Sequence, residues 1–250
     1  MNLIILTDAD RLDNDRFRLS DHRAEHIRSI LKSRVGETVE IGLLNGAIGK
    51  ASIEDIGEDS IVLLIRETVG LVYPLPQVDL TCALPRPQTL KKVLLTSAMM
   101  GVRRLDLIRA RRVERSYYHS PLLQPENYRP YLLEGLAQGK LTRLPEVQVH
   151  ERFRPFMEDV LVARDGVPEE TTLKLLPHPE ATLSIGGIVN MDPPPSAIQV
   201  AIGPEGGWVD FERELMQQQG FSPVLLSRWV LRVEHAVTAA LAQIELLRLS

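Results

Sequence analysis

The stretch that decides the fold reads IQVAIGPEGGW at residues 198–208. Its first five residues are short and apolar, which predicts a strand buried on both faces of an α/β sheet. Three glycines follow in the loop at 203–207, and glycine permits backbone conformations and close approaches that other residues do not. We expect another molecule to approach the bare backbone here, so a side chain at Gly206 would fill the space that a ligand needs.

The residues after this loop predict a helix, a second strand and a final helix. Asp210 is the expected N-cap of a helix that runs to Gln219 and closes at Gly220. A strand at 223–226 leads through a loop at 227–232 into a helix with an apolar stripe. Two strand-to-helix loops therefore emerge at the carboxyl edge of one sheet, where open α/β sheets place their ligands.

The glycine loop alone has a simpler interpretation as a turn. Pro204 and Glu205 break the dinucleotide-binding pattern G-x-G-x-x-G, and the loop lacks the Gly-Lys-Ser/Thr of a P-loop. Neighbouring loops favour a binding site over a turn, because the loop at 227–232 and a third loop after a strand at 173–176 reach the same edge. Strands at 78–83 and 103–108, separated by a helix at 89–100, predict that this sheet is parallel.

Two of these segments resemble motifs of the RsmE-like family of ribosomal RNA methyltransferases. Residues 202–207, IGPEGG, match the first family motif throughout, and residues 231–236, LRVEHA, match the second in part. The departures from the family pattern are Ser227, Trp229, His235 and, in a further matching segment, Met99.

The resemblance implies an α/β protein of the SPOUT class. Such enzymes methylate N3 of a uridine in 16S ribosomal RNA with S-adenosylmethionine, and they form homodimers through a knotted surface. We therefore expect a small PUA-like RNA-binding β barrel at 1–72 and a parallel-sheet SPOUT domain with a C-terminal trefoil knot at 73–250. The linker between them lies at 69–76, where two prolines suit an extended crossing.

The three loops at 176–179, 202–207 and 226–232 are expected to bind the cofactor in a bent form. The implied cofactor-binding residues are Leu176, Pro177, His178, Ile202, Gly203, Pro204, Gly206, Gly207, Leu226, Ser227, Val230 and Leu231.

Uracil N3 is a poor nucleophile until it loses its proton, so the site needs a base or a group that stabilises the uracil anion. Arg232 is the expected group that stabilises charge on O2 or O4. Glu205, Glu234 and His235 are the candidate bases, and the residues alone do not choose among them; Glu234 equally suits a helix N-terminus. The positions that differ from the family motifs keep two alternatives open. One is an RNA-binding homologue without turnover, and the other is a methyltransferase that acts on another RNA such as transfer RNA.

The first 70 residues predict a small β domain. A helix is expected from Asp21 to Arg34 with Ile27 and Ile30 facing inward, and Asn45-Gly46 predicts a type I′ hairpin. The apolar alternation predicts strands at 2–6, 39–43, 48–53 and 61–65.

Arginines supply the candidate RNA contacts. Residues 1–115 hold 18 basic and 16 acidic residues, whereas residues 116–250 hold 11 and 17, so the basic surface belongs mostly to the first half. The alternative is a solvated face offset by nearby aspartates. Tyr117 and Tyr118 follow the densest arginine segment and are suited to stack on unpaired bases. The candidates are Arg11, Arg16, Arg18, Arg23, Arg28, Lys32 and Arg34, then Arg86, Arg111, Arg112 and Arg115.

Composition limits the remaining possibilities. A net charge of −4 argues against indiscriminate nucleic-acid binding. The single cysteine, Cys82, excludes a disulfide framework and falls in a predicted strand, where it is expected to be inert. His22 and His26 lack a third ligand, so no metal is expected. No run reaches the length of a signal peptide or a membrane span, and the expected location is the cytoplasm.

Overall fold

The computed structural model describes residues 2–165, 171–188 and 195–249, and the chain divides into two units. The first unit consists of residues 1–72 together with 133–144, and the second of residues 73–132 and 145–250. The sequence pattern assigned the whole of 73–250 to one domain. Residues 133–144 depart from that expectation because they pack with the N-terminal strands.

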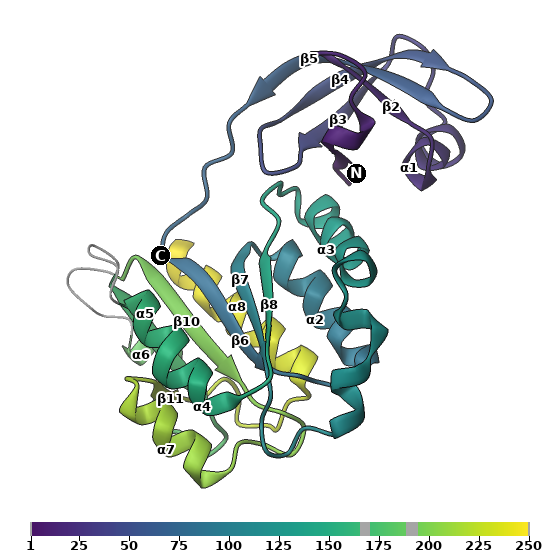
Figure 1. The fold of residues 1–250 in the computed structure, drawn as a ribbon. Helices are drawn as coiled ribbons and strands as arrows, with labels where there is room; N and C mark the ends of the chain where they lie inside the picture. Colours follow the sequence, from purple (N-terminus) through teal and green to yellow (C-terminus); the bar gives the residue numbers. More distant parts are fainter. Residues whose placement is uncertain (1, 166–170, 189–194, 250) are drawn as a thin grey trace. The chain divides into compact units, whose positions relative to one another are not determined.

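The first unit is built on a five-stranded sheet in the order β1-β3-β4-β5-β2 (Figure 1). β1 pairs with β3 in parallel, and the other neighbours are antiparallel. The strands are β1 (Ile4–Leu6), β2 (Arg16–Leu19), β3 (Thr38–Leu43), β4 (Ile48–Ile56) and β5 (Ile61–Val69). The sequence analysis missed β2, although Phe17 and Leu19 are buried and alternate with exposed arginines.

The helix of the first unit is shorter than predicted. α1 (His22–Glu25) continues into a π-helical turn, His26–Ile30, and the chain turns away at Lys32, whose φ is 52°. A π-helical turn has more residues per turn than an α-helix, so it rotates the residues that follow away from the expected face. Ile27 is fully buried as predicted, but Ile30 is 69% exposed and does not face inward.

The hairpin between β3 and β4 does not have the predicted type I′ geometry. Asn45 has a φ of 59°, while Gly46 is not left-handed, and the Gly46 N–H donates to the Leu43 carbonyl at 2.8 Å. A type I′ turn needs left-handed conformations at both central residues, and here only Asn45 supplies one.

Residues 133–144 complete the first unit. They begin within α3 (Pro125–Gly139) and follow it to Leu144. The Leu3 N–H donates to the Ala137 carbonyl at 2.9 Å, Lys140 Nζ lies 2.6 Å from Glu40 Oε2, and the Thr142 hydroxyl donates to the Gly46 carbonyl at 2.6 Å.

The second unit is an α/β domain with a six-stranded sheet in the order β11-β9-β10-β6-β7-β8 (Figure 1). All neighbouring strands are parallel, as predicted. The sequence analysis did not predict β8. The strands are β6 (Gln77–Ala83), β7 (Val102–Ile108), β8 (Glu146–His150), β9 (Thr172–Pro177), β10 (Ala197–Ile202) and β11 (Ser222–Val224).

Helices cover both faces of this sheet (Figure 1). α2 (Pro87–Met99) packs against α8 (Val233–Leu249) on one face. Cys82, on β6, is fully buried as predicted. On the other face, α4 (Phe153–Pro155), a π-helical turn (Phe156–Val160), α5 (Leu161–Asp165) and α7 (Asp210–Gln218) bury an apolar cluster. The remaining short elements are 3₁₀ turns at Asp8–Asp10, Arg115–His119 and Pro121–Leu123, and α6 (Ile185–Ile188).

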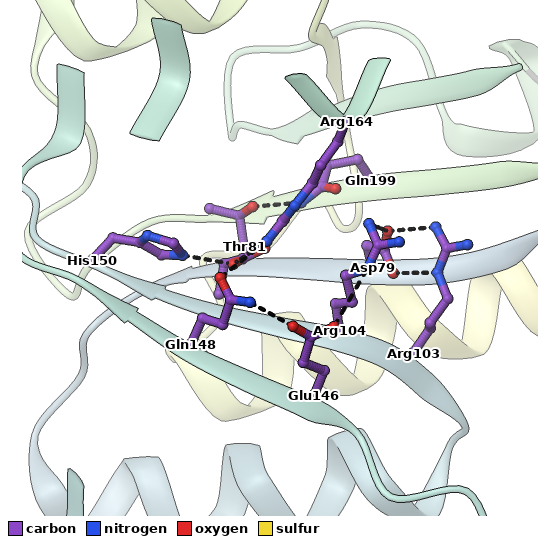
Figure 2. Close-up of polar contacts among 10 residues, drawn as sticks. Asp79, Thr81, Arg103, Arg104, Glu146, Gln148, His150, Arg164 and Gln199 are labelled. Atoms are coloured by element: carbon purple, nitrogen blue, oxygen red, sulfur yellow. Dashed lines mark hydrogen bonds and ion pairs between the residues drawn. The ribbon is translucent and has the colours of Figure 1, made fainter. Parts of the chain in front are cut away.

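The face covered by α5 carries a buried polar network on β6, β7 and β8 (Figure 2). Asp79 is 3% exposed and accepts hydrogen bonds from Arg103 Nε at 2.9 Å and Nη2 at 2.7 Å. Asp106 is fully buried, with His150 Nε2 2.7 Å from Oδ1 and Arg164 Nη1 donating to Oδ2 at 2.6 Å. These contacts tie strands β6, β7 and β8 and helix α5 together.

Candidate functional site

The three predicted loops converge on one cavity at the carboxyl edge of the parallel sheet. The cavity has a volume of about 550 Å³ and is lined by residues 177–179 after β9, 202–208 after β10 and 225–233 after β11, with Arg112 and Ala236. Residue 228 is the one position of the third loop that is not part of this wall. A concave space of several hundred Å³ with a mainly apolar wall is typical of a small-molecule site.

All but one of the expected cofactor-binding residues line this cavity. Leu176 does not, because its side chain is 1% exposed and belongs to the apolar cluster under α7. Trp208 was not expected in the wall, and the sequence signal for it was its position directly after the glycine loop. The expected residues that line the cavity are Pro177, His178, Ile202, Gly203, Pro204, Gly206, Gly207, Leu226, Ser227, Val230 and Leu231.

Two glycines of the loop lie close to side chains of the protein itself. A Cβ built on Gly203 would lie 3.0 Å from Trp208 Nε1, and a Cβ on Gly206 would lie 3.2 Å from Arg112 Cδ. Gly207 has a φ of +72°, a conformation that side chains rarely adopt. A side chain at Gly206 would therefore require Arg112 to move, and Gly206 also lines the larger cavity, so its effect on a ligand stays a prediction.

A second cavity of about 350 Å³ adjoins the first. Arg112, Glu205, Arg232 and Val233 line both cavities. The second cavity has a further wall from the start of α2 and from the segment after β7. The residues found only in this wall are Arg86, Thr89, Glu114, Tyr117 and Glu234.

The acidic candidates for a base differ in their surroundings. Glu205 is exposed at the junction of the two cavities, and its Oε1 accepts the Arg86 N–H at 3.4 Å. Glu234 is 7% exposed, and Lys92 Nζ donates to its Oε1 at 3.1 Å. The pKa of Glu234 is lowered by its own backbone N–H at the start of α8 and by Lys92, so its carboxylate is stabilised as an anion. His235 is exposed and lines neither cavity.

Arg232 directly precedes α8 and lines both cavities. Within the described part of the chain, this guanidinium has no hydrogen-bond or ion-pair partner. Arg112 differs, because its Nη1 donates to the Gly206 carbonyl at 2.6 Å and its side chain lies over the glycine loop. An unpaired cation beside a helix N-terminus opposes the helix dipole, so Arg232 contributes nothing evident to stability.

Glu212 is a structural residue that the sequence analysis missed. It is 3% exposed, and its carboxylate accepts the Val209 N–H at 3.0 Å and the Arg111 N–H at 2.7 Å. Val209 therefore precedes the helix, and Asp210 is the first residue of α7 instead of its N-cap. Gly220, with a φ of +86°, follows the helix end as predicted. The Arg111 contact anchors the segment that carries Arg112 and Tyr117.

The arginines of the first unit separate into paired and unpaired groups. Arg23 is held by Asp10 at 2.6 Å and Asp21 at 2.8 Å, and it also donates to the Ile5 carbonyl. Arg11, Arg16 and Arg28 also pair with nearby carboxylates. In the described residues, the side chains of Arg18, Lys32 and Arg34 have no such partner, so these cations remain available for phosphate groups.

The arginines of the second unit divide in the same way. Arg103 and Arg104 both pair with Asp79 and belong to the buried network. Arg86 and Arg112 line the second cavity. Arg111 and Arg115 are exposed and directly adjoin the cavity residues Arg112 and Glu114 in the sequence.

Residues 2–165, 171–188 and 195–249 contain no group of three or more His, Cys, Asp or Glu side chains arranged to hold a metal ion. None of the helices in these ranges is long and apolar enough to span a membrane.

The parallel sheet with a loop cavity at its carboxyl edge defines an α/β protein with a cofactor-type site. Residues 73–245 match the family model described as an RNA methyltransferase domain. Over 222 residues, the chain is 31% identical to the ribosomal RNA small subunit methyltransferase E of Treponema pallidum, covering 89% of this chain and 82% of that protein. This chain therefore belongs to the RNA methyltransferase domain family.

Solved structures share the fold. The ribosomal RNA small subunit methyltransferase E of Neisseria gonorrhoeae, bound to S-adenosyl methionine, superimposes with a TM-score of 0.76 at 20% identity and 98% coverage of both chains. A Legionella pneumophila protein in complex with the cofactor SAM gives a TM-score of 0.75 at 20% identity, covering 99% of this chain and 98% of the other.

Proposed function

We propose that this protein transfers a methyl group from S-adenosylmethionine to N3 of a uridine in 16S ribosomal RNA. The observation that carries the proposal is the convergence of three loops on one cavity, with Arg232 and Glu205 at its junction with a second cavity. Membership of the RNA methyltransferase domain family and the name of the Treponema relative support the reaction class and the RNA.

The residues of the larger cavity fit the proposed cofactor. Ile202, Leu226, Val230 and Leu231 offer an apolar slot suited to an adenine ring, and the loop backbone offers hydrogen bonds to it. The Glu205 carboxylate at the cavity junction suits the positive charge of a sulfonium. S-adenosylmethionine supplies an electrophilic methyl group.

The protein's own residues have distinct roles in this proposal. Glu205 takes the proton from uracil N3, which leaves the nitrogen with the electron pair that forms the new bond to carbon. Arg232 balances the negative charge that spreads to O2 or O4. Lys92 and the helix N-terminus hold Glu234 as an anion, which favours a positioning role for Glu234 over a proton-accepting one.

The charges of the second cavity also complement the edge of uracil. That edge presents the acceptors O4 and O2 on either side of the N3–H donor. The lining of this cavity includes the carboxylates of Glu114, Glu205 and Glu234, which are acceptors. It also includes Arg86, Arg112 and Arg232, whose guanidinium groups are donors. Cytosine carries a donor in place of O4, so this wall suits it less.

The remaining features of the resemblance belong to the same proposal. The first unit serves as a PUA-like RNA-binding module that supplies Arg18, Lys32 and Arg34 to phosphates. A C-terminal trefoil knot is supported by β11, which pairs with β9 on the side opposite β10, and by the Leu225 N–H, which donates to the Leu183 carbonyl. The protein acts as a homodimer, in the cytoplasm where its ribosomal substrate is found.

Calorimetry with S-adenosylmethionine, followed by methyl transfer to small ribosomal subunits from cells that lack the protein, tests the proposal. We expect binding, and we expect mass spectrometry to find one methyl group on N3 of a uridine. Absence of cofactor binding would remove the methyltransferase assignment. Binding without transfer would indicate a homologue without turnover, and transfer only to transfer RNA would change the substrate.

A further inference from the structure

We propose that Tyr117 is the face on which the target base stacks, so that the segment after β7 forms the substrate-binding wall of the second cavity. This inference rests on the proposed function because it names how the same site holds its substrate. Tyr117 is the one aromatic residue among the nine that line the second cavity.

The position of Tyr117 suits a base more than a small ion. The cavity of about 350 Å³ corresponds to roughly ten water molecules at about 30 Å³ each, which is far more space than one ion requires. The cavity shares Arg112, Glu205, Arg232 and Val233 with the cofactor cavity, so a base inside it lies beside the cofactor. A base at this point must leave its stack in the RNA, and an aromatic ring replaces the stacking that it loses.

The residues around Tyr117 favour the protonated phenol and hold the side chain in position. A tyrosine phenol is uncharged at neutral pH, and partial burial and the Glu114 carboxylate raise the pKa of Tyr117 further, so its ring does not repel a uracil that is losing its proton. The 3₁₀ turn Arg115–His119 holds the residue, and the Arg111 backbone bond to Glu212 anchors the chain just before it. Arg86, Arg112 and Arg232 line the same cavity, and their guanidinium groups suit the phosphates on either side of the base.

Affinity for fluorescein-labelled pentauridylate, methyl transfer to small ribosomal subunits and affinity for S-adenosylmethionine test the inference in the full chain. Tyr117→Ala is expected to weaken pentauridylate binding and kcat/KM for the ribosomal substrate by roughly 5- to 150-fold, the range for loss of one base–aromatic stack. Tyr117→Phe keeps the ring and is expected to restore both values. The matched control is Tyr131→Ala on α3, whose ring lies beside Lys91 and lines neither cavity.

The outcomes separate this inference from the proposed function. Weaker pentauridylate binding in Tyr117→Ala with rescue by Tyr117→Phe supports the stacking face, even if the wild-type protein fails to bind S-adenosylmethionine and the proposed function is lost. Wild-type behaviour of Tyr117→Ala would overturn the inference. Equal losses in the alanine and phenylalanine variants would assign the effect to the hydroxyl and also overturn it, as would a parallel loss of cofactor affinity and melting temperature in Tyr117→Ala.

Discussion

Arg232 is a cation without a partner in the described part of the chain, and it stands where two cavities meet. Replacing it with alanine is expected to lower methyl transfer by roughly 10²- to 10³-fold, comparable to the loss of one oxyanion donor. The melting temperature should hold or rise, because the guanidinium opposes the dipole of α8, and the cofactor affinity should be kept. Arg232→Lys should recover little, since a point charge does not reproduce the planar donor group. Unfolding of Arg232→Ala, with normal activity per folded molecule, would make the residue structural.

Glu205 is distinguished from the other candidate bases by its place at the cavity junction. Glu205→Gln is expected to lower kcat by roughly 10²- to 10⁴-fold, the contribution of a positioned base, while the fold is retained. Glu214→Gln on α7 is a suitable control, because Glu214 lines neither of the two cavities, and the separate cavity that it does line shares only His178 with the cofactor cavity. Comparable rates for Glu205→Gln and the wild-type protein would remove Glu205 as the base.

The predictability of these residues from sequence was uneven. The candidate bases all lie in or beside the motifs, but burial and pairing distinguish them. Glu234 is buried and pairs with Lys92, 142 positions away in the sequence, whereas Glu205 and His235 are exposed. The structural role of Glu212 could not be predicted from the sequence, because its partners are backbone N–H groups, one of which belongs to the distant Arg111.

At the scale of the elements, the glycine loop and Trp208 form one packed unit. Gly203→Ala is expected to lower the free energy of unfolding by roughly 1–3 kcal/mol and to weaken cofactor binding, because the added Cβ forces the indole to move. Gly206→Ala is the matched control and should have a smaller effect, since the Cβ there meets the flexible chain of Arg112. Urea unfolding and calorimetry measure both quantities. A greater loss in Gly206→Ala would reverse this view of the loop.

In the first unit, Arg23 and Arg18 can be compared to separate a role in stability from a role in RNA binding. Arg23→Ala should lower the free energy of unfolding by roughly 1.5–3 kcal/mol, because it removes hydrogen bonds between charged groups. Arg18→Ala should leave stability unchanged and reduce the salt dependence of RNA affinity. Thermal unfolding and RNA titrations at several salt concentrations measure these effects. A stable Arg23→Ala variant with weak RNA binding would place Arg23 among the phosphate contacts.

The elements that sequence patterns predicted well are those with strong apolar periodicity. The buried strands β6, β7, β9 and β10 and the final helix were predicted within a few residues. β2 and β8 were missed although polar and apolar residues alternate in both, because runs of only four and five residues are near the shortest length at which alternation can be recognised. The helix of the first unit was predicted too long because a π-helical turn leaves no clear mark on periodicity.

For the whole molecule, the buried network around Asp106 makes stability depend on pH. Burial would raise the pKa of Asp106, but hydrogen bonds from His150 and Arg164 hold it below the ordinary value of 3.8. A carboxyl group with a depressed pKa contributes its full stability above the unfolded-state pKa and loses it as pH falls through the folded-state pKa. We therefore expect stability to fall in the acid range below about pH 4.

Asp106→Asn isolates this contribution. The variant is expected to be destabilised by roughly 3–5 kcal/mol at pH 7, because Arg164 is left without its buried partner. The difference from the wild-type protein should narrow as the pH falls, since protonation removes the same charge from the wild-type side chain. Urea unfolding at neutral and acid pH measures both values. A constant difference at all pH values would show that Asp106 contributes by packing alone.

Because residues 133–144 belong to the first unit, this unit cannot fold completely until they have been synthesised. As the polypeptide leaves the ribosome, strands β1 to β5 emerge well before the segment that supplies Ala137, Lys140 and Thr142 to them. At the usual elongation rate of about 5–20 residues per second, several seconds pass between the synthesis of the N-terminal sheet and the synthesis of residues 133–144. During that interval, the edge that Leu3 offers to Ala137 is open to other nascent chains, so this enzyme's early folding is expected to depend on how quickly codons 73–144 are translated.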